Sequence, residues 1–359
     1  MSSRTVFFTG PREVEVRETN VPDPGPGELA VEALVSAVSP GTELLLYRGE
    51  MNPDLAVDET LDSLSGSLTY PFPYGYATVG VVTAVGPDAD PAWRGERVLA
   101  FHPHASEFVV DTDAVTRVPE GIAPEEAVFL PNVETAVTLS LDGEPAVGER
   151  AVVFGQGIVG LLTTAILSSF PLEELVTLDY HQSRRRRSER LGADRCLDPA
   201  DADPATLFAT ATDADGSADS PVAATPESAA GDADAPDRAD LTYELSGNPA
   251  ALDDAIDATG YGGRVVVGSW YGSRPAELSL DGRFHRSRIE LRSSQVSTLA
   301  PERRGRWTTD RRLTTAWRRL RDIDTDRLRT HRLPVEDAPE AYDLLDREPN
   351  EALGVLLTY

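Results

Sequence analysis

Residues 151–179, AVVFGQGIVGLLTTAILSSFPLEELVTLD, decide the fold of this chain. The stretch opens with a short apolar run, AVVF, of the kind that forms a buried parallel strand. Three glycines follow at the spacing Gly155-x-Gly157-x-x-Gly160, and after them comes an apolar segment that predicts a helix. A second apolar run, LVTLD, ends at Asp179. Strand, glycine turn, helix and strand in this order predict a βαβ unit within a parallel sheet.

The glycine pattern in this setting is typical of a dinucleotide-binding site. Gly155 permits a tight turn, Gly157 lets the backbone approach a pyrophosphate, and Gly160 lets the helix pack close to the sheet. Ile158 and Val159, at the start of the helix, then present free N–H groups and the positive end of the helix dipole to the phosphates. The alternative is a glycine-rich turn that binds no ligand.

Asp179 and the arginines that follow it bear on which dinucleotide is expected. A carboxylate at the end of the second strand accepts hydrogen bonds from both ribose hydroxyls, which favours NAD and repels a 2′-phosphate. Arg184 opens a run of four arginines, ending at Arg187, that is suited to hold such a phosphate. We therefore expect NAD as the cofactor, with NADP as the alternative.

Residues 241–270 continue the alternation, with two more strands and a helix near 249–258 between them. Ser246 and Ser269 follow these two strands. Ligands of such folds bind at the carboxyl ends of the strands, so we expect both serines to contact the cofactor. Tyr271, beside Ser269, is interpreted either as a neighbour of the nicotinamide or as an interface aromatic.

The first hundred residues have a different pattern, because short alternating runs are separated there by Gly and Pro turns, which predicts a β-rich domain. A helical stretch is expected at about 124–141. After about residue 296 come an amphipathic helix, a further helix and a closing strand. We predict an α/β protein with a β-rich catalytic domain of residues 1–135 and 297–359, and a doubly wound domain of residues 136–296.

Residues 198–240 do not continue this pattern of strands and helices. They are mostly Ala, Asp, Pro, Ser and Thr, with almost no large apolar side chain. Such a segment cannot bury enough surface to offset the entropy of ordering. We interpret it as a flexible acidic insertion between two strands of the sheet.

The composition bears on partners and compartment. The chain has 60 acidic and 33 basic residues, all of them arginine, for a net charge of −27. Such a surface repels nucleic acid and anionic membranes and, at ordinary salt, itself; concentrated salt screens that repulsion. The single cysteine, Cys196, excludes an intrachain disulfide, and no apolar run approaches the ~20 residues of a membrane span. With no signal peptide visible, we expect a soluble protein of a high-salt cytoplasm.

The arrangement resembles the medium-chain dehydrogenase/reductase superfamily, the alcohol dehydrogenase-like enzymes. Pro24–Val31 is similar to its Pro-x-x-Gly-x-x-x-Val pattern, residues 95–98 (GERV) to its Gly-Asp-Arg-Val element, and residues 192–194 to its Gly-Ala-Asp element. Residues 284–297 resemble a branch that includes bacteriochlorophyllide-type dehydrogenases. The resemblance implies a GroES-like catalytic domain, a Rossmann domain, a nicotinamide cofactor, a small-molecule substrate and a homodimer.

The usual zinc ligands of that superfamily are missing. Residues 40–43 (PGTE) stand where zinc members carry Cys-Gly-Thr-Asp, and residues 75–77 (GYA) stand where they carry Gly-His-Glu. Proline and alanine side chains cannot bind a metal, and a neutral tyrosine is a poor ligand. We therefore expect zinc to be absent. The alternative is an atypical zinc site built from Glu43, His102, His104 and Glu134.

Without zinc, other side chains must hold the substrate oxygen and manage one proton. The resemblance places Thr42 where the family has its relay hydroxyl. Tyr76, which replaces a histidine ligand, can donate a hydrogen bond to a developing alkoxide; the alternative is a packed strand aromatic. Asn132, Glu134 and Thr135 lie on a segment that resembles the family's cleft-lining helix. We predict Thr42, Tyr76 and Glu134 as catalytic residues and Thr135 as a cofactor contact.

The sequence thus predicts a zinc-independent, NAD(P)-dependent oxidoreductase. It would transfer a hydride between the nicotinamide and an alcohol, a carbonyl or an activated double bond. Two alternatives stay open: a zinc-dependent dehydrogenase with unusual ligands, and a dinucleotide-binding protein without turnover.

Overall fold

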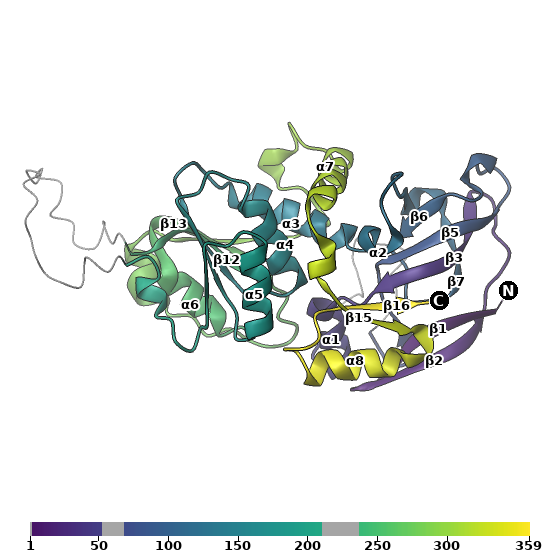
Figure 1. Ribbon diagram of the computed structural model, residues 1–359, viewed down its shortest axis with the longest axis horizontal. Coiled ribbons are helices and arrows are strands. Elements are labelled where there is room, and N and C mark those ends of the chain that lie inside the picture. Colours follow the sequence, from purple (N-terminus) through teal and green to yellow (C-terminus); the bar gives the residue numbers. More distant parts are fainter. Residues whose placement is uncertain (1, 52–67, 210–236) are drawn as a thin grey trace, which may run out of the picture. The chain divides into compact units, whose positions relative to one another are not determined.

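The computed structural model describes residues 2–51, 68–209 and 237–359, and the chain divides into two compact units (Figure 1). Unit 1 comprises Met1–Glu134 and Leu313–Tyr359, and unit 2 comprises Thr135–Arg312. No helix in the described part of the chain is long and apolar enough to cross a membrane.

Unit 2 is built on a six-stranded sheet with the order β11-β10-β9-β12-β13-β14, in which every neighbouring pair is parallel. This order confirms the doubly wound fold predicted from the glycine turn. The strands are β9 (Arg150–Phe154), β10 (Glu174–Leu178), β11 (Arg195–Leu197), β12 (Ala239–Glu244), β13 (Thr259–Val267) and β14 (Glu290–Ser293). The helices between them are α4 (Ile158–Leu167), α5 (Gln182–Arg190) and α6 (Ala251–Ala258).

The central strand β9 shows why both faces of this sheet are covered. Val152 and Phe154 pack into one apolar cluster together with α6, whereas Ala151 and Val153 pack into another cluster. Successive side chains of a strand point to opposite faces, so a strand that is apolar throughout needs a layer on each side. The unbroken run AVVF therefore specifies a strand with helices on both faces.

Unit 1 contains two sheets, of three strands (β2-β1-β4) and seven strands (β15-β16-β3-β5-β6-β8, with β7 paired to β3). The strands are β1 (Ser2–Gly10), β2 (Glu13–Asn20), β3 (Glu28–Ala37), β4 (Phe72–Pro73), β5 (Thr78–Val85), β6 (Arg97–Ala100), β7 (Glu107–Asp111), β8 (Val115–Arg117), β15 (Arg329–Pro334) and β16 (Gly354–Thr358). The helices are α1 (Pro40–Arg48), α2 (Pro124–Ala127) and α8 (Ala338–Arg347), while α3 (Leu130–Gly143) and α7 (Thr309–Asp322) contain the two crossings between units.

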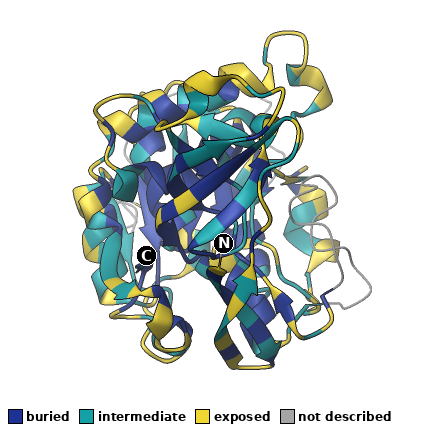
Figure 2. Cartoon of the chain, turned by 90° about the vertical axis from the view of Figure 1, so that its right-hand side faces the viewer, coloured by how far each residue is buried: buried dark blue, intermediate teal, exposed yellow. Residues whose placement is uncertain are grey.

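An aromatic cluster forms part of the core of unit 1. Phe8 of β1 and Tyr342 of α8 have no exposed surface, and their rings meet edge to face with centroids 5.1 Å apart. Tyr47 of α1 stacks on Tyr342 at 5.7 Å. The cluster joins elements distant in sequence, and Figure 2 shows buried residues concentrated along the strands.

Helix α1 was not expected, because Pro40 and Gly41 indicate a turn; Pro40 instead occupies the first helical turn, which tolerates proline.

The second boundary between the units lies after Arg312 rather than at residue 297. Arg303 donates a hydrogen bond to the Leu141 carbonyl at 2.6 Å and pairs with Glu144 at 2.5 Å. Ser294 donates to Asp142 at 2.6 Å. These contacts hold the segment against the end of α3 that belongs to unit 2, and the sequence pattern could not show them.

The ends of the predicted acidic insertion belong to the fold. Leu207 and Phe208 are 3% and 4% exposed and pack in the same cluster as α6, and β12 begins at Ala239. Two large apolar side chains of the segment thus reach the core, which its composition did not indicate, while the flexibility expected for the segment stays a prediction. Residues 210–236, which make up the rest of the insertion, lie outside the described residues.

Candidate functional site

The three glycines of the turn between β9 and α4 each meet a different steric demand. Gly155 has φ +87°, and a Cβ there would lie 2.4 Å from Ser246 Cα. A Cβ on Gly160 would lie 2.0 Å from the Gly155 carbonyl oxygen. A Cβ on Gly157, by contrast, would meet nothing within 4 Å. The turn thus requires two of the glycines for its own geometry and leaves open space above the third.

That open space lies at the start of α4. Gly157 is the N-cap residue, and no side chain caps the N–H groups of the first turn, which include those of Ile158 and Val159. An uncapped N-terminus beside open space suits a phosphate, which the helix dipole also attracts. The residues present fit the pyrophosphate of a dinucleotide.

Asp179 follows β10 and is 7% exposed. One carboxylate oxygen accepts the Gln156 N–H at 2.8 Å, and the other accepts the His181 N–H at 2.8 Å. Each oxygen has a second lone pair, so the carboxylate can still accept from ribose hydroxyls. Asp179 therefore also fixes the glycine turn, a role that the sequence did not reveal.

The arginine run is engaged by neighbouring groups. Arg184 Nη1 lies 3.8 Å from an Asp179 carboxylate oxygen, and burial lowers the pKa of this guanidinium. Arg185 donates to the Asp179 carbonyl at 2.7 Å and pairs with Asp198 at 2.9 Å, while Arg187 donates to the Ser183 carbonyl at 3.0 Å. Arg184 and Arg185 thus connect α5 to Asp179 and Asp198, whereas Arg187 bonds within the helix.

The ends of β12 and β13 contribute a second polar group at the same sheet edge. Glu244 is fully buried, and its carboxylate accepts from the Ser246 N–H at 2.8 Å, the Ser246 hydroxyl and the Tyr271 hydroxyl. Burial, followed by the Glu244 charge, raises the pKa of Tyr271. Ser269 accepts the Gly247 N–H at 2.9 Å. The two predicted serines are thus brought together through Glu244, which sequence reasoning missed.

In unit 1 the structure brings Thr42 and Tyr76 together. Tyr76 precedes β5 and Thr42 lies in the first turn of α1. The phenol hydrogen-bonds with the Ser39 hydroxyl, and the side chains of Thr42 and Asn132 lie near it. Burial, with a smaller contribution from the nearby Glu43 carboxylate, raises the pKa of Tyr76 to about 12. The side chains of Ser39, Thr42 and Asn132 oppose this shift. The phenol therefore keeps its proton at neutral pH.

Two other predicted residues lie on α3. Glu134 is 8% exposed and lies two positions beyond Asn132, so the two side chains leave the helix in different directions. Thr135 is half-buried and is the first residue of unit 2. The roles predicted for Glu134 and Thr135 stay predictions.

The alternative zinc ligands are differently placed. His104 Nε2 lies 3.1 Å from a Glu43 oxygen, and both side chains are fully buried. His102 instead stacks on Phe108 with centroids 4.1 Å apart. Across the described residues, no three His, Cys, Asp or Glu side chains gather as a metal site would require. The Glu43–His104 pair supplies two donors, short of the three protein ligands typical of a catalytic zinc.

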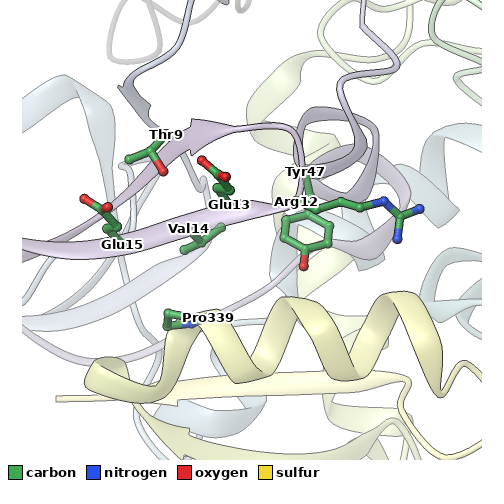
Figure 3. Close-up of a pocket in the computed structure, with 7 residues that line it drawn as sticks. All are labelled: Thr9, Arg12, Glu13, Val14, Glu15, Tyr47 and Pro339. Carbon is green, nitrogen blue, oxygen red and sulfur yellow. The ribbon is translucent and has the colours of Figure 1, made fainter.

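A hollow of about 420 Å³ in unit 1 lies elsewhere (Figure 3). It is lined by Thr9, Arg12, Glu13, Val14, Glu15, Tyr47 and Pro339. None of these is a predicted site residue, and Arg12 already pairs with Asp346. The candidate site does not include this hollow.

Some participants carried weak signals in the sequence. Glu244 ends the expected strand at the carboxyl edge of the sheet, where ligands of such folds bind, and a carboxylate there could have been noticed. Ser39 stands before residues that indicate a turn, and no pattern in the sequence indicated its contact with Tyr76. The Glu43–His104 pairing joins residues far apart in the sequence and needed the fold.

Comparison with known proteins places this arrangement among dehydrogenases. The family model described as zinc-binding dehydrogenase matches residues 159–313. L-threonine 3-dehydrogenase of Thermococcus kodakarensis is 24% identical over 297 residues, covering 74% of each chain. The 2-desacetyl-2-hydroxyethyl bacteriochlorophyllide A dehydrogenase of Rhodobacter capsulatus is 24% identical over 364 residues, covering 98% of this chain and 96% of that protein.

Solved structures share the fold over the whole length. An alcohol dehydrogenase from Escherichia coli CFT073, complexed with NADH, has a TM-score of 0.76 at 19% identity and covers 100% of this chain and 99% of its own. The 2R,3R-butanediol dehydrogenase from Bacillus subtilis has a TM-score of 0.74 at 16% identity, with 100% of both chains covered. At these identities the likeness is one of fold.

Proposed function

We propose that the chain is a member of the medium-chain dehydrogenase/reductase superfamily, and that it is an NAD(P)-dependent dehydrogenase or reductase that works without the superfamily's usual catalytic zinc. The observation that carries this proposal is the Tyr76 phenol, which hydrogen-bonds with Ser39 and has Thr42 and Asn132 beside it. The sequence resemblance puts this tyrosine where zinc members have a histidine ligand. Its substrate would be an alcohol, a carbonyl compound or an activated double bond.

The edge of the unit 2 sheet supports a nicotinamide dinucleotide as the cofactor. Gly157 and the uncapped start of α4 would hold the pyrophosphate, and Asp179 would accept hydrogen bonds from the adenosine ribose. We propose NAD over NADP, because a carboxylate at this position repels a 2′-phosphate and because Arg185 and Arg187 already have local partners. When bound, the nicotinamide supplies or accepts the hydride.

Tyr76 and Thr42 would then act on the substrate oxygen. A neutral phenol donates a hydrogen bond to the oxygen as negative charge develops on it, and can pass its proton to the resulting alkoxide. Because its pKa lies near 12, Tyr76 is a donor rather than a base at neutral pH.

The donor set argues against the usual zinc. The side chains of Pro40 and Ala77 carry no metal-binding atom, and Tyr76, which directly precedes Ala77, retains its proton. We expect no stoichiometric zinc in protein purified without chelators, as measured by elemental analysis. One tightly bound zinc per chain would show that the atypical-zinc alternative is right.

The function is tested by unfolding and turnover measurements in concentrated KCl. Ligand at about 100 times its dissociation constant adds about 2.7 kcal/mol, so NAD(H) should raise the melting temperature by several degrees, and more than NADP(H) does. A panel of aldehydes, ketones, enones and alcohols then tests for hydride transfer at 340 nm. Binding without any turnover would instead favour the non-catalytic alternative.

Tyr76→Phe and Thr42→Val test the catalytic assignment. Loss of a general acid lowers kcat by about 10²- to 10⁴-fold, and we expect Tyr76→Phe to fall in that range and Thr42→Val to lower kcat less. Dinucleotide binding should be unchanged in both variants, which is the control. Full turnover by both variants would show that these hydroxyls do not carry the chemistry.

A further inference from the structure

Unit 1 contains a buried hydrogen-bonded chain that the proposed reaction does not use. Glu43 of α1 is fully buried and accepts from the Ser39 N–H at 2.7 Å, from the Tyr342 hydroxyl and from His104 Nε2 at 3.1 Å. His104 Nδ1 in turn lies 2.7 Å from Ser36 Oγ, and Ser36 Oγ lies 2.8 Å from the Tyr359 hydroxyl. A buried carboxylate needs such partners, yet they do not explain why it is there.

The side chain of Ser39 does not cap α1, although Ser39 is the first residue before that helix. It is the N-cap residue, and a serine there ordinarily accepts an N–H of the first turn with its side chain. Here the side chain makes no such bond and contacts the Tyr76 hydroxyl instead. Glu43 holds the backbone of Ser39 in two places, because its N–H donates to the Ser39 carbonyl at 2.8 Å and its carboxylate accepts the Ser39 N–H at 2.7 Å.

We propose that Ser39 and Glu43 are positioning residues for the Tyr76 phenol. This inference rests on the proposed function of Tyr76. Glu43 fixes the Ser39 backbone, which releases the Ser39 hydroxyl from capping, and the hydroxyl then donates to the phenol oxygen. The phenolic O–H is thereby left to point at a substrate oxygen rather than at Ser39.

The rest of the buried chain gives Glu43 its fixed orientation. The Ser39 N–H, Tyr342 O–H and His104 N–H converge on its two oxygens, so both are bound by donors. A glutamine at this position would present an amide NH₂ on one side and leave at least one of these donors without an acceptor. Glu43→Gln therefore preserves volume and loosens Ser39.

The direct test is NMR of the whole protein labelled with [¹³Cζ]tyrosine in concentrated KCl, because the shift of this carbon reports hydrogen bonding of the phenol. The Tyr76 resonance is identified by its loss in Tyr76→Phe. We expect it to move in Ser39→Ala and in Glu43→Gln, and to return towards its original position in Ser39→Thr, which restores the hydroxyl. Ser169→Ala is the matched control, since the Ser169 hydroxyl donates to the Ile166 carbonyl at 2.7 Å in unit 2 and has no part in the buried chain; it should leave the Tyr76 resonance in place.

Kinetics on the best substrate of the panel provides the second readout. Loss of one hydrogen bond of about 1 kcal/mol corresponds to about a fivefold change in rate, so Ser39→Ala should lower kcat about five- to tenfold with little change in KM. Ser39→Thr should recover most of the loss. These two results together support positioning, which a merely structural role of Ser39 would not produce.

The two proposals fail differently. A Tyr76 resonance that stays in place in both Ser39→Ala and Glu43→Gln would overturn the positioning role, whether or not Tyr76→Phe is inactive. Full turnover by Tyr76→Phe would overturn the proposed chemistry, while the NMR result would still report whether Ser39 holds the phenol.

Discussion

His102 connects the stability of unit 1 to pH. Its ring stacks on Phe108, and burial lowers the pKa of the imidazole from 6.5 to about 4. The pKa is thus lower in the folded than in the unfolded chain, so between pH 6.5 and 4 the unfolded state binds more protons. The free energy of unfolding must therefore fall as the pH drops through this window, by at most about 1.4 kcal/mol per pH unit from this group.

His102→Gln removes that dependence. We expect the difference in unfolding free energy between pH 7 and pH 4.5, measured by chemical denaturation, to be smaller in His102→Gln than in the wild type. His285→Gln, which replaces an exposed histidine, is the control and should retain the wild-type difference. Equal pH dependence in all three proteins would contradict the assignment.

Residues that act through local geometry were the ones open to prediction. Gly155, Gly160 and Asp179 could be placed from spacing alone, because a tight turn and the end of a strand are local features. The pairs Glu43–His104 and Glu244–Tyr271 could not, since each joins segments whose approach depends on packing. Ser39 could not be predicted either, because its contact with Tyr76 is tertiary and takes the place of the helix cap that its position would otherwise supply.

Helix α4 and its turn allow a paired test of two glycines that look equivalent in the sequence. Gly160→Ala places a Cβ against the Gly155 carbonyl oxygen, so the helix must shift. Gly157→Ala adds a Cβ in open space. We expect Gly160→Ala to lower the melting temperature of the ligand-free protein, and Gly157→Ala to leave that temperature nearly unchanged while weakening NAD(H) binding at least tenfold.

Thermal unfolding with and without NAD(H) measures both effects, and each variant serves as the other's control. If Gly157→Ala binds NAD(H) as the wild type does, the dinucleotide does not approach that backbone and the site must be placed elsewhere.

The elements of unit 2 were predictable because strands and helices there differ in length and pattern. Expected runs at 151–154 and 249–258 correspond to β9 and α6 within a few residues. Unit 1 was harder to predict. Helix α1 begins with residues that also form turns, and β15 has a mixed burial pattern with no strict alternation, so its pairing to β16 was not visible.

The net charge of −27 acts on the molecule as a whole. On α6, for example, Asp253, Asp254 and Asp257 lie on one helix, and burial followed by the charges of the other two raises the pKa of Asp254. Repulsion of this kind opposes folding at low ionic strength and is screened when the Debye length falls to about 3 Å near 1 M salt.

We therefore expect the melting temperature to rise steeply between low and multimolar KCl. Asp254→Asn should be more stable than the wild type at low salt and should gain less from added KCl. Sucrose, which screens no charge, is the comparison for non-ionic effects. A melting temperature that does not rise with KCl would contradict a high-salt adaptation.

We also propose that the protein forms a homodimer. Sedimentation in concentrated KCl measures its oligomeric state.

The division of the chain into units has a consequence for its synthesis. Unit 2 is one continuous segment, Thr135–Arg312, whereas unit 1 needs both its first 134 residues and Leu313–Tyr359. Strand β16 pairs with β3, and the Tyr359 hydroxyl reaches Ser36. During synthesis unit 2 can therefore fold before unit 1 is complete, because the edge of β3 that pairs with β16 has no partner until the segment Leu313–Tyr359 has been made. Chaperone demand should accordingly concentrate on the amino-terminal segment of the nascent chain.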